Sequence, residues 1–285
     1  MQALFTIDVE DYFHTVEGEH VPKLAQWDAL PTRVEKNTQV LLDILDEYKV
    51  KSTCFVLGYV ARRHPDLVRE ISRRGHEVAS HGMNHKHVYE MAPEEFAQDL
   101  ETSKKLLEDI CGNEVLGFRS PGFSYTDSSP WFFDKLIEKG YSFDSSVFPA
   151  ARFEGGIKTD QFDPHWVTTS QGRIFEFPIT VAPVFGKNIC FFGGGYLRLF
   201  PKWMIVSMTK RLQRAQRSVL YYIHPREIDP SHPRFKMNAL NSFRSYVNLK
   251  TVEGKLRAIL KLSEFINCRD YLQQIKLQED KNASG

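Results

Sequence analysis

The chain has few cysteines, and no two of them stand at a functional spacing. The four, Cys54, Cys111, Cys190 and Cys268, are far apart and form no C-x-x-C motif, which excludes a zinc knuckle or a dithiol redox centre. We expect reduced and mostly buried thiols, as is usual for free cysteine.

Net charge and long apolar runs are also lacking. The 37 basic and 36 acidic side chains leave a net charge of +1, so no overall field would attract nucleic acid. No stretch reaches the roughly 18 consecutive apolar residues of a membrane span, and no signal-peptide pattern opens the chain. No phosphate-binding glycine motif follows a strand. We expect a cytoplasmic protein without a nucleic-acid partner, and the oligomeric state stays open.

The 285 residues, 42% of them hydrophobic, are enough for one large α/β domain with an extension. Strands are expected at 3–9, 52–57, 76–80, 115–118, 141–144, 174–181 and 218–223. Helices are expected at 33–49, 65–74, 93–111, 130–139 and 202–217, the first capped by Thr32. Residues 146–172 are expected to form a long loop or an added hairpin. This alternation predicts a parallel sheet of about seven strands, closed or nearly closed into a barrel.

Polar side chains that could perform chemistry stand at the ends of these apolar runs. They are Asp8, Glu10, His81, His85, Arg119, Asp144 and His224. Barrels of parallel strands carry their chemistry at the carboxyl ends of the strands, so residues far apart in sequence can meet there. The pattern therefore predicts a metal-dependent hydrolase.

His81 and His85 are four residues apart, a spacing that lets two imidazoles share one metal ion from a tight turn. The pair alone is weak, because such a spacing often arises by chance. Asp8, Glu10 and Asp11 add carboxylates at the end of an apolar strand, where a cation would compensate their charge. For Asp11, the last of the three, a solvated loop that begins early is the alternative.

Four segments resemble, in the right order, the motifs of the polysaccharide deacetylases, the carbohydrate esterase family four enzymes with a NodB homology domain. They are Thr6–Asp11 (TIDVED), Ser80–His85 (SHGMNH), Arg119–Phe123 (RSPGF) and Tyr222–Pro225 (YIHP). Other segments resemble the deacetylases encoded beside exopolysaccharide and exosortase gene clusters. They are Asp8–Phe13, Gly193–Arg198, His224–Asp229 and Tyr246–Leu249.

The resemblance implies a distorted (β/α)7 barrel over residues 1–228. A partly helical extension at 229–285 would pack on this barrel, and the polar tail after Gln278 would be frayed. The resemblance also implies a divalent metal and hydrolysis of the acetamido group of an N-acetylated amino sugar.

By resemblance, Asp8 is the general base and Arg119 orients it, while His224 is the general acid and Asp144 tunes that histidine. His81 and His85 then become the imidazole ligands of the metal. A surface ion pair is the alternative for Arg119, and a core histidine is the alternative for His224.

The third metal ligand is open, because this chain has Asp-Val-Glu-Asp where the family commonly has two adjacent aspartates. Glu10 shares a strand face with Asp8, which favours Glu10, whereas a bulge in the strand would give the role to Asp11. Zinc suits imidazole and carboxylate ligands, and Co²⁺, Ni²⁺ or Mn²⁺ fit the same donors.

Backbone N–H groups near Gly122 and Phe123 are candidate donors to a developing oxyanion, and Pro121 beside them is a candidate substrate contact. Tyr196 and the glycines before it could face a sugar, since glycine permits close approach and aromatic rings stack on pyranoses; a plain turn is the alternative. The helix at 202–217 mixes apolar and basic residues. It could touch the inner face of a membrane peripherally or simply cover the barrel.

The expected substrate is an N-acetylated saccharide, with a lipid-linked or nucleotide-linked precursor as its specific forms. Two other functions compete with N-deacetylation. One is a C–N amide hydrolase of the same fold that acts on a small cyclic amide or formamide, and the other is a sugar-binding protein without catalysis.

Overall fold

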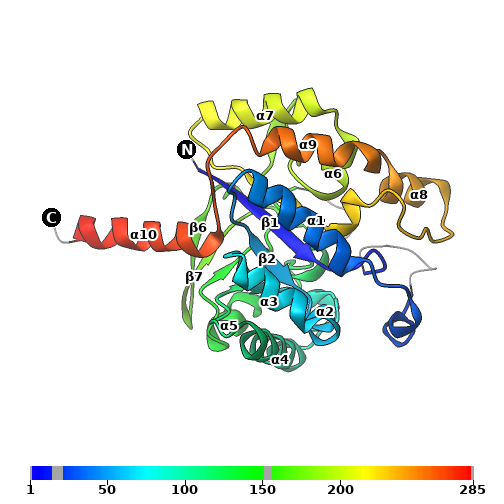
Figure 1. The fold of residues 1–285 in the computed structure, drawn as a ribbon. Coiled ribbons are helices and arrows are strands. Elements are labelled where there is room, and N and C mark those ends of the chain that lie inside the picture. The colour runs from blue at the N-terminus through cyan, green and yellow to red at the C-terminus, as the bar shows by residue number, and fades with distance from the viewer. Residues whose placement is uncertain (1, 15–21, 151–155, 284–285) are drawn as a thin grey trace.

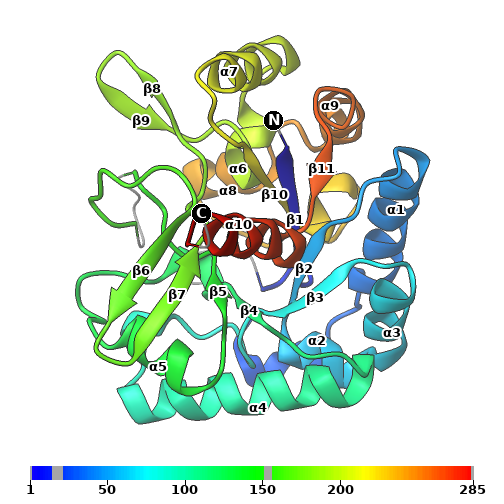
Figure 2. The ribbon, with the colours of Figure 1, turned by 90° about the vertical axis from the view of Figure 1, so that its left-hand side faces the viewer.

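A nine-stranded sheet forms the centre of the protein in the computed structural model, which describes residues 2–14, 22–150 and 156–283. Figure 1 shows β1 and β2 in the middle of the molecule. The order of the strands is β10-β1-β2-β3-β4-β5-β7-β6, and β11 pairs with the start of β1 (Figure 2). The strands are β1 (Ala3–Val9), β2 (Thr53–Val56), β3 (Glu77–Ser80), β4 (Gly117–Phe118), β5 (Phe143–Asp144), β6 (His165–Thr169), β7 (Gly172–Glu176), β10 (Leu220–Ile223) and β11 (Phe265–Ile266).

The strands from β10 through β1, β2, β3, β4 and β5 to β7 are parallel, which confirms the predicted parallel sheet of seven strands. β6 runs antiparallel to β7 at the edge, so the stretch at 146–172 ends in an added hairpin. Among the described residues, no ladder joins β7 or β6 to β10. The barrel is therefore open on that side, where a separate hairpin of β8 (Ala182–Val184) and β9 (Lys187–Ile189) is inserted.

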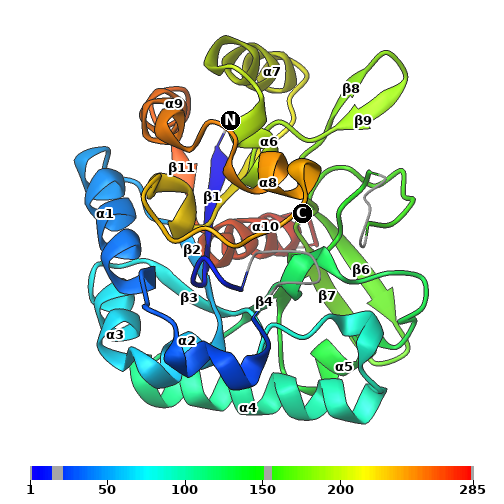
Figure 3. The ribbon, with the colours of Figure 1, turned by 90° about the vertical axis from the view of Figure 1, so that its right-hand side faces the viewer.

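Helices cover the outside of the sheet, and Figures 2 and 3 show them arranged around it. They are α1 (Val34–Glu47), α2 (Gly58–Arg63), α3 (Pro65–Arg73), α4 (Pro93–Cys111), α5 (Phe132–Glu138), α6 (Gly194–Leu199), α7 (Lys202–Arg214), α8 (Ala239–Tyr246), α9 (Val252–Ile259) and α10 (Cys268–Ala283). All seven side chains of β1 are buried, because helices and the barrel interior enclose both of its faces.

α4 shows how the sequence fixes one of these helices. Pro93 opens it in the first turn, and Gly112 ends it in the left-handed conformation at φ 68°. Phe96, Leu100 and Leu107 lie on one face and are buried in the core. The resulting βα units bring the carboxyl ends of the strands to one side of the molecule, which faces the viewer in Figure 3.

The C-terminal residues pack on the barrel. Leu256 and Ile259 of α9 are buried in the main core. α10 lies across the opposite end of the barrel from the strand carboxyl ends, with Leu272 buried (Figure 2). α10 continues past Gln278 to Ala283, and Glu279 accepts a hydrogen bond from the Trp166 indole, while fraying of this tail stays a prediction.

No helix among the described residues combines the length and the apolarity that crossing a lipid bilayer requires.

Glu77 at the start of β3 gives a prediction on pH and stability. Its side chain is buried, accepts hydrogen bonds from Thr53 Oγ1 and Arg269 N, and has its pKa raised by burial to about 7. A carboxyl whose pKa is higher in the folded state than in the unfolded state, near 4.5, loses stability as the pH rises through that window. Glu77→Gln cannot ionise. We expect the free energy of unfolding of Glu77→Gln, relative to that of the wild type, to rise by about 3 kcal/mol between pH 4.5 and pH 8.

Urea denaturation of both proteins at several pH values measures this difference. A difference in unfolding free energy that does not change with pH would show that Glu77 titrates normally in the folded state.

Candidate active site

Glu10, His81 and His85 form a cluster that could hold a metal ion. Glu10 follows β1, His81 follows β3, and His85 lies in the turn after it, so two parallel strands with β2 between them bring the three together. One ligand atom from each residue lies within 4.8 Å of the others. Two imidazoles and a carboxylate are a usual ligand set for zinc and related cations.

The tautomer of His81 suits metal binding. Its Nδ1 lies 2.8 Å from the carbonyl oxygen of Arg119, and because a carbonyl can only accept, Nδ1 carries the proton. Nε2 therefore offers a lone pair to the cluster, and this kind of contact often orients a ligating histidine. Burial lowers the pKa of His81, which keeps the ring neutral, as a ligand must be.

Glu10 and His85 lie as close together as two ligands of one metal ion. His85 Nε2 lies 2.8 Å from Glu10 Oε2, yet Glu10 Oε2 is buried without a hydrogen-bond donor. Burial alone would raise the pKa of Glu10, but His85, His224 and His81 together hold it well below its usual range. A buried, ionised oxygen lies here beside an imidazole nitrogen without a directed hydrogen bond. Such a pair of atoms is suited to bind one divalent cation together.

Asp11 does not compete with Glu10 for this role. Its Oδ2 accepts hydrogen bonds from Thr32 Oγ1 (2.6 Å), Arg33 N (2.8 Å) and Val34 N (3.1 Å), and its Oδ1 accepts one from Tyr12 N. The Asp11 carboxylate therefore caps the first turn of α1. Thr32, expected to be the cap, instead donates to Asp11, and the alternative of Asp11 as metal ligand is wrong because both of its oxygens are occupied.

Asp8 and Arg119 form a buried ion pair beside the cluster. Arg119 Nη1 lies 2.6 Å from Asp8 Oδ1, and Arg119 also donates to Thr6 Oγ1 and to both the carbonyl and the hydroxyl of Ser145. The guanidinium stacks 4.1 Å from the centre of the Phe55 ring. Arg119 has no exposed surface, so the alternative of a surface ion pair is wrong.

His224 directly follows β10 and lies beside both Asp8 and Glu10. Its Nε2 lies 3.6 Å from Asp8 Oδ2 and 3.5 Å from Glu10 Oε1, while Nδ1 lies 3.5 Å from Glu227 Oε2. Burial alone would lower the pKa of His224, but Glu227 and then Glu10 and Asp8 raise it above its usual value. Such a histidine holds a proton next to a candidate base, as a general acid must.

Asp144 lies elsewhere in the barrel. Its carboxylate accepts from Ser146 N and Ser146 Oγ, and it is paired with Glu176 of β7. Burial raises the pKa of Asp144, and that of Glu176 still more. The carboxylate that faces Nδ1 of His224 is Glu227, so the expectation that Asp144 tunes His224 is corrected: a glutamate on the same loop has that position.

The segment from Pro121 to Phe123 turns back beside Arg119. The Phe123 N–H donates to the carbonyl of Ser120 at 3.1 Å, so the expected oxyanion donation from Phe123 is wrong, because its hydrogen is used inside the turn. Gly122 lies in the left-handed region at φ 63°, and its role and that of Pro121 stay predictions. Tyr196 of α6 is half-buried and lies near Phe148. Its contact with substrate stays a prediction.

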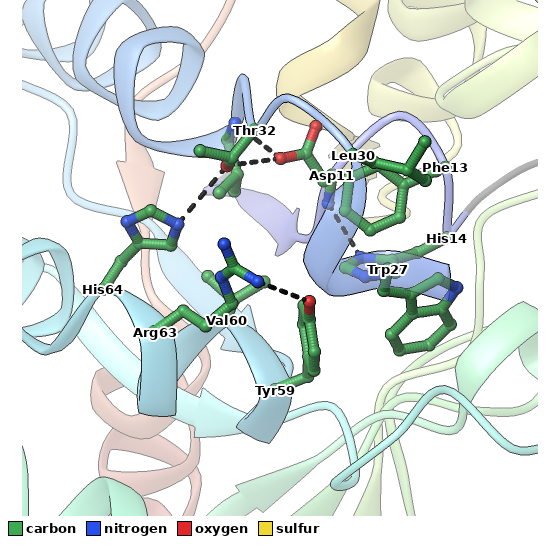
Figure 4. A pocket seen from close by; sticks show the side chains of 11 residues that line it. Asp11, Phe13, His14, Trp27, Leu30, Thr32, Tyr59, Val60, Arg63 and His64 are labelled. Atoms are coloured by element: carbon green, nitrogen blue, oxygen red, sulfur yellow. Dashed lines mark hydrogen bonds between the residues drawn. The ribbon is translucent and has the colours of Figure 1, made fainter. Parts of the chain in front are cut away.

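His14 was not found from the sequence. Its Nδ1 accepts a hydrogen bond from Asp11 N at 2.9 Å, its Nε2 is buried without a partner among the described residues, and its ring stacks 6.3 Å from that of His85. Burial lowers the pKa of His14 to about 3. The ring also lines a small pocket walled by Trp27 and Tyr59 (Figure 4). His14 thus borders both the pocket and the metal-binding cluster.

Glu227 could have been found from the sequence. It stands three residues after His224 and accepts from the His224 backbone N–H at 3.1 Å, which is the spacing of a capping box. Arg198, its partner at 3.1 Å, lies far away in sequence and offered no such signal.

Two family models match this chain. The polysaccharide deacetylase model matches residues 24–136, which contain His81, His85 and Arg119. A domain of unknown function, DUF3473, matches residues 145–273, which contain His224. Asp8 and Glu10 precede both matched segments.

Curated relatives match a part of the chain. A peptidoglycan-N-acetylglucosamine deacetylase of Bacillus cereus is 35% identical over 104 residues, which are 36% of this chain and 47% of that protein. A chitooligosaccharide deacetylase of Rhizobium leguminosarum bv. trifolii is 35% identical over 74 residues, which are 26% of this chain and 34% of that protein. The chain thus spans less than half the length of these relatives.

Solved structures share the fold over nearly the whole chain. A candidate polysaccharide deacetylase from Mycobacterium smegmatis superposes with a TM-score of 0.66 at 19% identity, covering 98% of this chain and 91% of that one. Puue allantoinase superposes with a TM-score of 0.59 at 12% identity, covering 94% and 88%. The expected distorted (β/α) barrel is confirmed. The polysaccharide deacetylase model thus resembles a segment of this chain that contains His81, His85 and Arg119, the deacetylase relatives resemble a part of the chain, and the solved structures share its fold.

Proposed function

We propose that this protein is a metal-dependent N-deacetylase that hydrolyses the acetamido group of an N-acetylated amino sugar in a saccharide. The observation that carries the proposal is the convergence of the Glu10, His81 and His85 cluster with the buried Asp8 and with His224. The names of the matched relatives, deacetylases of peptidoglycan N-acetylglucosamine and of chitooligosaccharides, support the same reaction.

Glu10, His81 and His85 would hold the cation. Zinc is the first choice, and Co²⁺, Ni²⁺ and Mn²⁺ suit the same donors. A divalent cation at this position would polarise the acetyl carbonyl and make water more acidic.

Asp8 and His224 would divide the proton transfers. Asp8 takes a proton from the attacking water, whose oxygen adds to the carbonyl carbon, and Arg119 holds the Asp8 carboxylate in place. When the C–N bond breaks, the nitrogen keeps the bonding electron pair and receives the proton from His224 Nε2. The products are the free amine of the sugar and acetic acid, which releases its proton to become acetate, and the proton held by Asp8 passes back to His224 to restore the site.

The substrate is proposed to be a saccharide precursor of an exopolysaccharide, carried on a lipid or a nucleotide. The segments Gly193–Arg198 and Tyr246–Leu249, which resemble those of deacetylases beside exopolysaccharide gene clusters, support this choice. α7 exposes 69% of Trp203 beside Lys202, which supports peripheral contact with an anionic membrane surface.

Acetate release tests the proposed function. We expect the zinc-loaded protein to release acetate from chitooligosaccharides or from UDP-N-acetylglucosamine, and we expect a chelator to stop the reaction. Acetate is measured by a coupled enzymatic assay, and the new amine is measured by mass spectrometry of the sugar as a loss of one acetyl group.

Allantoin is the comparison substrate, because the barrel resembles that of an allantoinase in fold. Hydrolysis of allantoin without acetate release from any saccharide would replace N-deacetylation with cyclic-amide hydrolysis. Saccharide binding without either reaction would leave a sugar-binding protein.

A further inference from the structure

The glycines at 193–195 bring α6 against β10. Gly193 forms a parallel bridge with Tyr222, and a Cβ atom on Gly193 would lie 2.1 Å from the Tyr222 ring. Gly194 has φ 53°, and its Cβ would lie 2.9 Å from the same ring. Only glycine permits this approach, so Gly193 and Gly194 have a packing role, and the sugar-facing role of the segment stays a prediction.

The close approach places Arg198, in the last turn of α6, beside Glu227. Arg198 Nε lies 3.1 Å from Glu227 Oε1 in an ion pair without a directed hydrogen bond, and both residues are buried, with 6% and 1% of their surface exposed. Arg198 Nη1 also donates to the carbonyl of Ser245 in α8. The guanidinium is therefore held from two sides.

The two oxygens of Glu227 face different partners. Oε1 faces Arg198, and Oε2 accepts from His224 N at 3.1 Å and lies 3.5 Å from His224 Nδ1. A buried carboxylate that lost its cation would have one oxygen without a partner and could turn away from the imidazole. Arg198 thus fixes the rotation of Glu227, and Glu227 fixes the imidazole of His224.

We propose that Arg198 is a positioning residue for proton donation by His224 and that it acts through Glu227. The pair keeps His224 Nε2 directed into the space that it shares with Asp8 Oδ2, 3.6 Å away. This inference deepens the proposed function and rests on it, because it takes His224 as the donor to the leaving amine. It also assigns a task to α6, which lies in the segment matched by the domain of unknown function.

Substrates with different leaving groups distinguish a role of Arg198 in proton donation from a general structural role. An amine can leave the acetyl carbon only when it is protonated, so hydrolysis of an acetamide needs the proton of His224. The 4-nitrophenolate of 4-nitrophenyl acetate leaves without a proton, while the metal and Asp8 are still required. A defect confined to His224 therefore slows hydrolysis of the acetamide and spares that of the ester.

The experiment compares kcat for a chitooligosaccharide and for 4-nitrophenyl acetate in the zinc-loaded protein. We expect Arg198→Met and Glu227→Gln each to lower kcat on the saccharide by about 10-fold to 100-fold with little change in KM. On the ester we expect a change of less than about 3-fold, since this leaving group needs no proton. His224→Ala should show the same split, with a larger loss on the saccharide.

The double variant Arg198→Met/Glu227→Gln tests whether Arg198 acts through Glu227. We expect it to be no slower on the saccharide than Glu227→Gln alone, because both substitutions interrupt the same connection. Effects that multiply, or an equal loss on both substrates, would overturn the proposal and leave Arg198 as a structural residue. If Arg198→Met does not fold, Arg198→Lys and Glu227→Gln carry the same comparison.

Zinc content serves as the control, because neither Arg198 nor Glu227 belongs to the metal-binding cluster. Zinc content should stay at the wild-type value in every variant. Loss of zinc in Arg198→Met would overturn the proposal that Arg198 acts only on proton donation by His224. Failure of the wild-type protein to release acetate would instead reject the proposed function, whatever the variants do.

Discussion

Replacing His81 with alanine is expected to empty the metal site and to abolish acetate release. Structural zinc sites contribute about 10–16 kcal/mol over four ligands, so loss of one protein ligand should weaken zinc binding by roughly a hundredfold to a thousandfold. His81 is fully buried, and its Nε2 has no other evident task than to meet Glu10 and His85. Zinc content after dialysis and isothermal titration measure the affinity, and acetate release measures the activity.

A pair of isosteric variants next to each other in the sequence provides the matched control. Glu10→Gln should lose zinc as His81→Ala does, because a neutral amide is a poor ligand. Asp11→Asn should keep zinc and activity, and should lower the free energy of unfolding by about 1 kcal/mol, because Asp11 caps α1. Unchanged zinc affinity in His81→Ala, or loss of zinc in Asp11→Asn with zinc retained in Glu10→Gln, would contradict the ligand assignment.

The parallel sheet could be predicted from the sequence because its signals are local. Each strand is an apolar run, each helix has a periodic face, and Gly112 or Pro93 marks an end within a few residues. The ends of these runs also located Asp8, His81 and His224, since parallel strands all deliver their carboxyl ends to one side.

What the sequence could not supply depends on contacts between distant segments. The alternation of strand faces favoured Glu10 but left Asp11 open as the third ligand, and only the position of α1 shows that the Asp11 oxygens are used as a helix cap. Arg198 meets Glu227 because of the packing of α6 on Tyr222, which no spacing announces. The polar tail that suggested fraying continues α10, which packs on the barrel through Leu272.

Asp8→Asn is expected to cut acetate release by about 10²-fold to 10⁴-fold while zinc binding stays close to that of the wild type. An asparagine cannot take the proton of the attacking water, and Asp8 is not one of the three residues of the metal-binding cluster. The substitution should also lower the free energy of unfolding by about 3 kcal/mol, because it leaves the charge of Arg119 buried without its carboxylate. Acetate release, zinc content and urea denaturation measure the three effects.

The loss of activity and the loss of stability in Asp8→Asn can be separated by removing the charged side chain of Arg119 as well. In Asp8→Asn/Arg119→Met, the unpaired charge of Arg119 is removed, and the methionine can pack on Phe55 where the guanidinium stacked. We expect stability to return towards that of the wild type while acetate release stays as low as in the single variant. Activity that recovered together with stability would mean that Asp8 only neutralises Arg119. Recovered stability without activity would instead assign proton abstraction to the Asp8 carboxylate.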